Sequence, residues 1–467
     1  MSGTTHSLWR RWASNSMANL IGGVAAAGVS VLLPSIVAKH LDTASFSVWN
    51  LALQVVVYVN LLSLGLQTAT ARALAHAADA GTDIAQMPVI VRAARSISHA
   101  ASVIALLLVA VLVVAYPLMF PGVSSSLVGD FRWTLMLFGL GAVAQILAQV
   151  EMGVFQGLHR NVEFVMVNVV MKLLTVAVVW LGVKAQQPMA VLALLMAAST
   201  ALLWPAMRTN VSRKVSWARE IGRTALDHAT RLDLLKYCGT LSVWSLMTML
   251  VNSVGIIIVG RIDFVLAGAY AIAMTAANVV VGLLGAALAP LMTSAAALNA
   301  SEAGRPRLQM LLTRSTLGVA LGLNLFLAVV TWLAPDLLRL WVGDSYVHSA
   351  GPLMVILVGA HCLRNIGAPY ALMMLGTGLH TRALTSAILE GLVNVAAAVA
   401  LGMKYGAVGV ACGTLVGAVV GVLGSLWLNT GRTPELTPRP LHFSLVAVLL
   451  PVVLFAPLHF FLVQRIF

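Results

Sequence analysis

The chain has 467 residues, of which 60% are hydrophobic and 9% are charged, with a mean hydropathy of +0.95 and a formal net charge of +13. A soluble globular domain usually has about 25% charged residues, so this composition excludes that class. The apolar residues form blocks of about 20, the length that an α-helix needs to cross a membrane, and they do not alternate as barrel strands would. The sequence therefore predicts an all-α, polytopic membrane protein.

Thirteen apolar segments qualify as spans. They cover residues 13–38, 46–70, 98–118, 132–157, 163–183, 188–208, 237–260, 265–291, 316–336, 350–376, 382–402, 407–428 and 443–463. With the N-terminus placed in the cytoplasm, most of the 28 Lys and Arg residues fall on the cytoplasmic side, as the positive-inside rule requires. The positive charge therefore indicates topology, and it does not indicate a nucleic-acid partner.

The span count predicts four regions along the chain. Residues 1–208 would form an N-terminal lobe of six spans, 209–236 a cytoplasmic linker, 237–430 a C-terminal lobe of six spans, and 431–467 an extra span. The linker has a partial apolar face among basic residues. Two interpretations stay open for it: an amphipathic helix attracted to anionic lipid, or a solvated tether.

Two short matches indicate that the lobes repeat each other. Gly157-Leu158-His159 and Gly378-Leu379-His380 lie 221 residues apart, and Trp49 and Tyr270 are separated by the same number. Six spans per lobe would give both lobes the same orientation, which defines a parallel repeat. Transporters built from such repeats commonly hold their substrate between the halves, near the middle of the bilayer.

Four charged residues lie inside the apolar blocks. Lys172 is about 14 Å from the end of its span, too deep for its side chain to reach the membrane surface. A lipid-facing ammonium at that depth costs about 2.5–3.5 kcal/mol, so we expect Lys172 to face the protein interior. Glu151 lies on the preceding helix at a similar depth, which predicts an ion pair with Lys172. Arg364 and Glu390 flank the equivalent turn of the second lobe and predict a second pair.

These charges admit two roles. Either two neutralised ion pairs lock the hairpins, or the cations contact an anionic headgroup while the carboxylates tune them. Amide side chains inside the spans, among them Asn19, Asn60 and Asn168, are candidates to contact sugars or to hold helices together. The three cysteines have neither a metal-site spacing nor a disulfide framework, and we expect no metal and no cofactor.

Several stretches resemble the polysaccharide flippases, the Wzx-type O-antigen and exopolysaccharide transporters of the multidrug/oligosaccharidyl-lipid/polysaccharide (MOP) superfamily. The similar stretches include "LLPSIVAKHLDTASFSVWNLALQ", "LLSLGLQTATARALA", "LDLLKYCGTLSVWSL" and "LLRLWVGDSYVHSAGPLMVILVGA". The segment "LGTGLHTRALTSAILEGLVNVAAAVALGMKYGAVGVACGTLVG" is similar to the eleventh and twelfth spans of that family. The resemblance covers most of residues 13–428.

The resemblance implies two six-helix lobes in a MATE-like V shape and alternating access in a bacterial inner membrane. The implied cargo is an oligosaccharide on undecaprenyl diphosphate, moved from the cytoplasmic to the periplasmic leaflet for surface polysaccharide assembly. Lys172 and Arg364 match the cationic residues that family members commonly have in the central cavity. The implied partners are this lipid-linked oligosaccharide, membrane lipids and other polysaccharide assembly proteins.

Three alternatives remain. A multidrug or cation antiporter of the same superfamily tends to use an acidic residue in the first span, and residues 13–38 contain none. A lipid II flippase tends to carry charge in that span, which is again missing. A membrane enzyme acting on lipid-linked sugars would need paired acids at the outer face, where the short loops offer only single aspartates. We therefore expect a transporter and not an enzyme.

Overall fold

A computed structural model describes residues 21–63, 65–79, 85–299, 302–379, 382 and 384–464. The ordered elements of these residues are all helices, and no strand occurs among them. Eleven of the helices are long and apolar enough to cross a membrane, or twelve when the bent pair Ser245–Asn252 and Val254–Ile262 counts as one span. The prediction of an all-α, multi-pass membrane protein is confirmed.

One of these apolar stretches, Thr385–Arg432, contains two antiparallel helices. The backbone reverses at Gly406, whose φ of 62° is a conformation that glycine adopts without strain. Beyond this turn the chain runs back along itself, because Gly417 lies against Asn394 and Gly421 lies against Glu390. The stretch therefore holds the two spans expected at 382–402 and 407–428.

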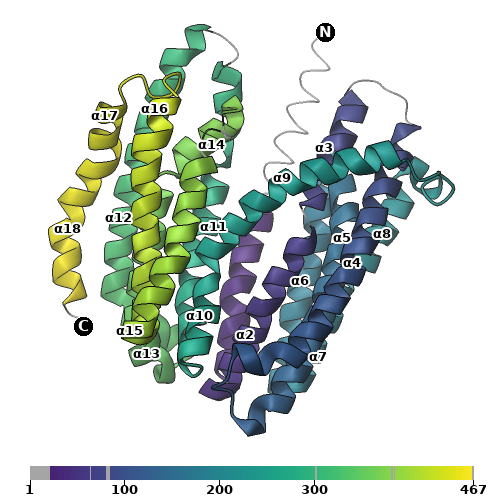
Figure 1. Cartoon of the computed structure of the whole chain (residues 1–467), viewed down its shortest axis with the longest axis horizontal. Coiled ribbons are helices and arrows are strands. Elements are labelled where there is room, and N and C mark those ends of the chain that lie inside the picture. The colour runs from purple at the N-terminus through teal and green to yellow at the C-terminus, as the bar shows by residue number, and fades with distance from the viewer. Residues whose placement is uncertain are drawn as a thin grey trace. The chain divides into compact units, whose positions relative to one another are not determined.

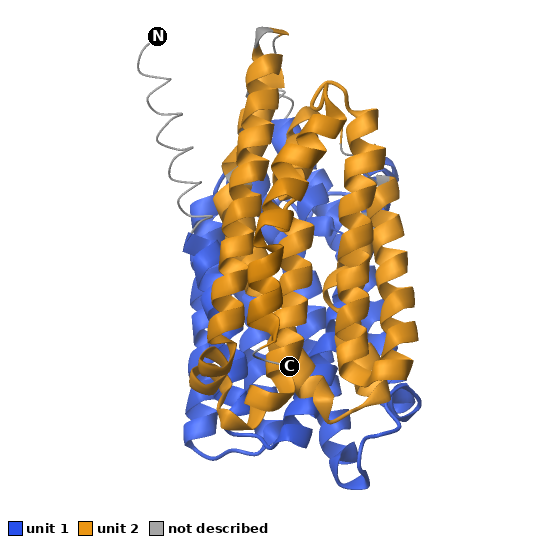
Figure 2. Ribbon diagram, turned by 90° about the vertical axis from the view of Figure 1, so that its left-hand side faces the viewer, with its two compact units in different colours: residues 1–246 blue, residues 247–467 orange. Residues whose placement is uncertain are grey.

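The chain forms two compact units, Met1–Leu246 and Met247–Phe467, which Figure 2 shows in blue and orange. The helices of unit 1 are Ile21–Ala38, α2 (Thr43–Val59), α3 (Leu66–Asp79), α4 (Gln86–Met119), α5 (Val128–Gly157), α6 (Asn161–Lys184), α7 (Met189–Ala201), α8 (Leu203–Lys214) and the first part of α9 (His228–Asn252). Helix α5 packs against α2, α3, α4, α7 and α8, so it is central to this unit (Figure 1).

Unit 2 is built around α13. Its helices are α10 (Val254–Ile262), α11 (Leu266–Asn299), α12 (Arg305–Val342), α13 (Val347–Asn365), α14 (Ala368–Thr377), α15 (Leu384–Gly424), α16 (Thr430–Arg432), α17 (Pro440–Phe443) and α18 (Leu450–Val463). Helix α13 packs against α11, α12 and α15, and α18 packs against α12 (Figure 1). The extra C-terminal helix is therefore attached to unit 2 through α12.

The order of elements is similar in the two units. A short 3₁₀ turn joins two long helices in each, Ser125–Leu127 between α4 and α5, and Asp344–Tyr346 between α12 and α13. Trp49 and Tyr270, the aromatic pair at the 221-residue offset, are both buried near the start of a long helix. This is the order of elements that a parallel repeat predicts.

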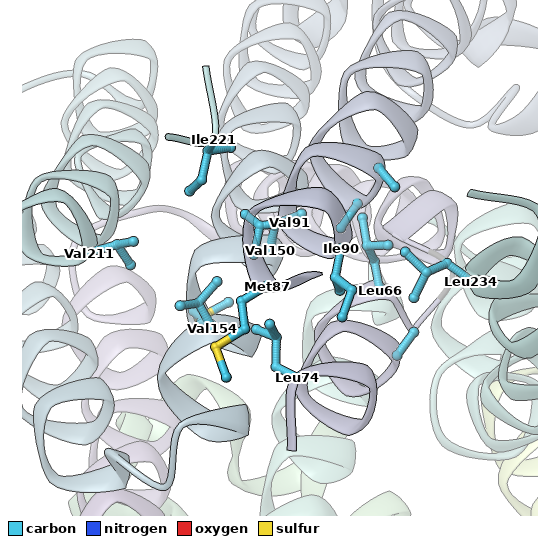
Figure 3. Close-up of a cluster of buried hydrophobic side chains, with 14 of the residues drawn as sticks. Leu66, Leu74, Met87, Ile90, Val91, Val150, Val154, Val211, Ile221 and Leu234 are labelled. Carbon is cyan, nitrogen blue, oxygen red and sulfur yellow. The ribbon is translucent and has the colours of Figure 1, made fainter. Parts of the chain in front are cut away.

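The predicted linker, 209–236, packs on unit 1, and its first residues belong to α8. Val211, Val215, Trp217 and Ile221 are buried in a hydrophobic cluster with residues of α3, α4, α5 and α9, and Figure 3 shows Val211 and Ile221 within it. The Nη1 atom of Arg160 also donates a 2.7 Å hydrogen bond to the backbone oxygen of Lys214. The expected solvated tether is wrong, because the apolar side chains of this segment are buried in protein, whereas attraction of its basic residues to anionic lipid stays a prediction.

Candidate functional site

Glu151 lies on α5, in the interior of unit 1, and its side chain is 1% exposed. Arg95 of α4 binds it in a two-point contact, with Nε 2.9 Å from Oε1 and Nη2 3.0 Å from Oε2. A planar guanidinium matches a carboxylate in this bidentate geometry, which is the strongest form of such a pair. The pair fastens α4 to α5, and a hydrogen bond from the Ser98 hydroxyl to the Ile146 backbone oxygen joins the same helices.

The expected ion pair between Glu151 and Lys172 is therefore wrong. Arg95 lies outside the predicted third span, because the apolar block there begins at residue 98. The helix itself begins at Gln86, and Ile90, Val91, Ala94 and Ile97 bury the face next to Arg95. The sequence does contain a sign of this: residues 86–97 have an amphipathic helical pattern that continues the helix ahead of the apolar block.

Lys172 lies on the interior face of α6. Val165, Lys172 and Val179 are spaced by seven residues, which places them on one face of a helix, and both valines are buried. The exposed apolar stripe lies elsewhere on the helix, with side chains between 46% and 63% exposed at Met166, Val170, Leu173, Trp180 and Leu181. Its helical position and its intermediate burial agree with the prediction that Lys172 faces the protein interior, which stays a prediction.

No acidic side chain among the described residues pairs with Lys172. Glu151, the carboxylate expected to do so, already has a bidentate partner in Arg95. Lys172 is half-buried, so its side chain is not sealed in the core. A charge in that position attracts an anion, because the surrounding apolar side chains screen it less than water would.

In unit 2 the predicted pair of Arg364 and Glu390 is confirmed. The Nε atom of Arg364 on α13 donates to Oε1 of Glu390 on α15, and the two side chains are 15% and 16% exposed. A Cβ atom on Gly421 would lie 2.4 Å from the Cδ atom of Glu390, so a larger residue would displace this carboxylate. The pair is enclosed by the α15 hairpin, and it leaves little net charge at this position.

Arg364 and two residues near the pair in the chain, His361 and Asn394, have buried polar atoms without hydrogen-bond partners. The Nη1 and Nη2 atoms of Arg364 are buried without a hydrogen-bond partner, and so are both ring nitrogens of His361. Asn394, one turn beyond Glu390, donates to the backbone oxygen of Leu250, while its Oδ1 atom has no donor. Buried donors and acceptors of this kind are usually satisfied, so this part of unit 2 is not a sealed apolar core.

The amide candidates are less informative. Asn168 lies one turn before Lys172, and its Nδ2 atom is 3.7 Å from the sulfur of Met152. Asn60 is the C-terminal cap of α2, where its backbone amide bonds to the carbonyl groups of the preceding turn. Asn19 lies outside the described residues. In the described part of the chain, no cluster of His, Cys, Asp or Glu could hold a metal ion.

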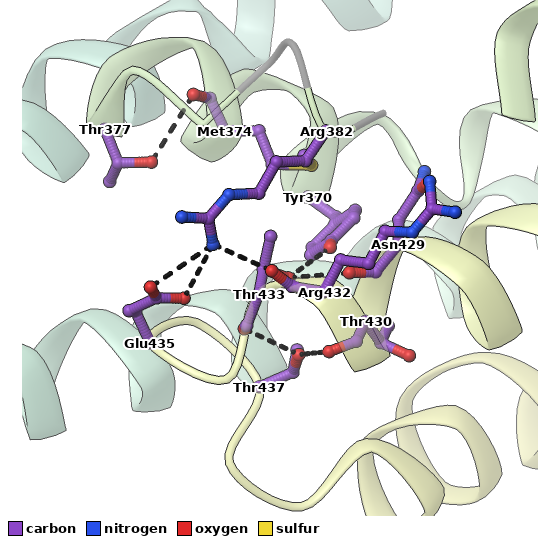
Figure 4. A network of polar contacts seen from close by, with 10 residues as sticks. All are labelled: Tyr370, Met374, Thr377, Arg382, Asn429, Thr430, Arg432, Thr433, Glu435 and Thr437. Atoms are coloured by element: carbon purple, nitrogen blue, oxygen red, sulfur yellow. Dashed lines mark hydrogen bonds and ion pairs between the residues drawn. The ribbon is translucent and has the colours of Figure 1, made fainter. Parts of the chain in front are cut away.

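A polar network holds the segment between α15 and α18. Arg382 donates through Nη1 to the Arg432 backbone oxygen and to the Glu435 carboxylate, as Figure 4 shows. The Tyr370 hydroxyl is 2.5 Å from the Thr433 hydroxyl. Hydrogen bonds to its own backbone amide and to Arg382 lower the pKa of Glu435, and partial burial opposes them. The network fixes the chain that leads to the extra helix.

This chain is similar to known proteins in its fold but not in its sequence. No protein-family model matches the sequence, and no curated protein is similar enough to match it. An inward-facing multidrug resistance MATE family transporter of the MOP superfamily aligns with a TM-score of 0.70 and 17% identity, covering 88% of this chain and 95% of that chain. The fold is that of the MOP superfamily transporters.

Two further transporters share it. The lipid II flippase MurJ, in an inward closed conformation, aligns with a TM-score of 0.67 and 12% identity, over 97% of this chain and 98% of that chain. A eukaryotic MATE transporter aligns with a TM-score of 0.61 and 14% identity, over 98% and 99%. The MATE-like fold expected from the sequence is confirmed, and at these identities the likeness shows the fold alone.

Proposed function

We propose that the chain is a flippase that moves an oligosaccharide linked to undecaprenyl diphosphate from the cytoplasmic to the periplasmic leaflet by alternating access. The observation that carries this proposal is Lys172, an interior-facing cation without an acidic partner among the described residues. A flippase must carry a diphosphate through a region of low dielectric constant, where a fixed cation offsets much of the cost of leaving water.

The other charges are assigned to the scaffold. Glu151 is bound by Arg95, and Glu390 is bound by Arg364, so neither carboxylate repels an anionic headgroup as an isolated charge would. Arg364 is a weaker candidate contact than Lys172, because its unpartnered Nη atoms are buried and its charge is balanced. We therefore propose that Lys172 makes the main electrostatic contact, with Asn168 beside it for a sugar or phosphate oxygen.

The same charge distribution disfavours a cation antiporter. Such a transporter needs a carboxylate that exchanges protons or metal ions with the substrate path, whereas both carboxylates buried in the described spans have arginine partners. A lipid II flippase stays a second candidate, because MurJ shares the fold and the name of that protein specifies a lipid cargo. A competition assay with lipid II and with a lipid-linked O-antigen unit separates these two cargoes.

Export of surface glycan in the source bacterium tests the proposal. We expect Lys172→Ala to abolish display of the glycan while the amount of protein in the membrane stays unchanged, and Lys172→Arg to retain most of it. Lys184→Ala is the matched control, since it removes an exposed cation at the far end of the same helix. Normal display in the Lys172→Ala strain would refute the proposed role of Lys172.

A further inference from the structure

The linker that packs on unit 1 turns its cations outward. Five basic side chains between residues 208 and 223 are exposed, and Glu220 is the acidic residue among them. No carboxylate in the described residues forms an ion pair with any of the five. We name these residues the cationic linker surface: Arg208, Arg213, Lys214, Arg219 and Arg223.

Packing of the linker fixes this surface in place. The buried apolar residues alternate with the exposed cations, since Val211 and Val215 bracket Arg213 and Lys214, and Ile221 lies next to the segment that bears Arg223. The hydrogen bond from Arg160 to the Lys214 backbone oxygen holds the middle of the segment. A chain held in this way loses little further entropy when its side chains bind a ligand.

The surface begins at the end of a membrane span. Helix α8 continues the apolar stretch Met189–Lys214, and the Arg208 guanidinium lies 5.6 Å from the centre of the Trp204 ring. Tryptophan rings near span ends lie at the level of the lipid headgroups. The cations that follow Trp204 therefore lie at or just beyond that level, where phosphate groups are concentrated.

The same end of unit 1 leads to Lys172. Arg160, which contacts Lys214, immediately precedes α6, and Lys172 lies eleven residues into that helix. At 1.5 Å per residue, the ammonium-bearing position is about 16 Å from the start of α6 along the helix axis. A phosphate group held at the linker would thus need to move by about half the thickness of the hydrocarbon core to reach Lys172.

We propose that the cationic linker surface binds phosphate-bearing lipid headgroups and gathers them at this end of unit 1. The ligand chemistry is a lipid phosphate or diphosphate, which several exposed cations of one segment attract near a membrane surface. This inference rests on the proposed function, in which Lys172 receives the headgroup that the linker has bound. The positive-inside rule explains the presence of these cations, because they orient the chain during insertion. It does not explain why packing holds them in a fixed array.

Binding to the full-length protein in nanodiscs of neutral lipid tests the inference. One probe is farnesyl diphosphate, and a second is phosphatidylglycerol at a low fraction of the disc lipid. The test variant combines Arg213→Gln, Lys214→Gln, Arg219→Gln and Arg223→Gln, and it leaves Arg208 and the buried residues unchanged. The control variant combines Lys184→Gln and Lys404→Gln, which removes exposed cations elsewhere.

We expect the test variant to bind the diphosphate probe about tenfold more weakly than wild type near 0.1 M salt, and the difference to shrink toward none near 1 M. The control variant should bind as wild type does. A loss confined to the diphosphate probe would identify the lipid-linked cargo as the source of the headgroup. An equal loss with phosphatidylglycerol would identify the bulk anionic lipid, and both outcomes support the surface.

Unchanged binding of both probes in the test variant would overturn the inference and leave the cations as an orientation signal only. Binding of the diphosphate probe to the Lys172→Ala variant distinguishes failure of this inference from failure of the proposed function. If Lys172 has no role but the linker surface binds headgroups, the diphosphate probe still binds Lys172→Ala in a salt-dependent way. Circular dichroism and gel filtration of the test variant check that it folds.

Discussion

The Arg95 guanidinium holds the Glu151 carboxylate at two points, with 2.9 Å from Nε to Oε1 and 3.0 Å from Nη2 to Oε2. This pair fastens α4 to α5, and it removes from Lys172 the carboxylate that lies at a similar depth. Among the described residues, Lys172 is therefore left without an acidic partner because another helix supplies the cation that binds Glu151. In unit 2 the corresponding hairpin carries Arg364 and Glu390, which neutralise each other.

Exchange of charges distinguishes the real pair from the expected one. The double variant Arg95→Glu with Glu151→Arg should recover most of the stability that either single substitution removes, because breaking a buried pair costs about 3–5 kcal/mol. The double variant Glu151→Lys with Lys172→Glu should recover none. Thermal unfolding of the purified protein measures both cycles, and rescue by the second exchange would show that Glu151 and Lys172 interact.

The contact of Gly421 with Glu390 predicts a specific interaction between two substitutions. Gly421→Ala should destabilise the α15 hairpin by about 1–3 kcal/mol, because the new methyl group would overlap the carboxylate. Adding Glu390→Ala should reduce the further cost of the alanine, since the obstacle is then absent. Gly282→Ala is the control, as no heavy atom lies within 4 Å of its Cβ position. Equal costs of Gly421→Ala in both backgrounds would contradict the packing.

The burial of Trp217 predicts that one side chain keeps the linker in place. Trp217→Ala removes a large buried ring and should weaken the attachment of the linker by about 3 kcal/mol. Trypsin should then cleave at Arg219 or Arg223 much faster than in wild type. Trp427→Ala, which removes an 82% exposed ring, should leave the cleavage rate unchanged. Equal cleavage rates in wild type and Trp217→Ala would contradict the packed linker.

The lowered pKa of Glu435 predicts a loss of stability in acid. Hydrogen bonds to its own backbone amide and to Arg382 favour the ionised form in the folded protein, relative to the ordinary value of 4.5. The contribution to stability is therefore present above pH 4.5 and is lost as pH falls through the lower folded value. Thermal unfolding of Glu435→Gln should lack this acid-dependent component, whereas an identical pH profile for both proteins would exclude it.

The helices were predictable from sequence because the hydrocarbon core requires about 20 apolar residues per span. The pair of Arg364 and Glu390 was predictable for a related reason, since both charges lie inside apolar blocks on either side of one turn. Arg95 was missed because it precedes its apolar block, where a basic residue ordinarily belongs to a loop. Its helix begins at Gln86, so the residue lies on a buried helical face.

The packing of the linker could not be read from the pattern of its residues. Apolar residues at Val211, Val215 and Ile221 fit lipid as well as protein, because both environments are apolar. These residues are buried in protein because a complementary apolar surface exists, to which α3, α4, α5 and α9 all contribute. Such contacts join residues far apart in the chain, and periodicity within one segment contains no information about them.

Transport by the purified chain in liposomes tests the central claim most directly. The measurement is the initial rate at which a fluorescent undecaprenyl-diphosphate oligosaccharide crosses the bilayer, compared among wild type, Lys172→Ala and Lys184→Ala. We predict a rate at least about tenfold lower for Lys172→Ala, because a lost charge-assisted contact is worth about 1.5–3 kcal/mol, and an unchanged rate for Lys184→Ala. Equal rates in all three proteins would contradict the assignment of Lys172 as the contact for the diphosphate.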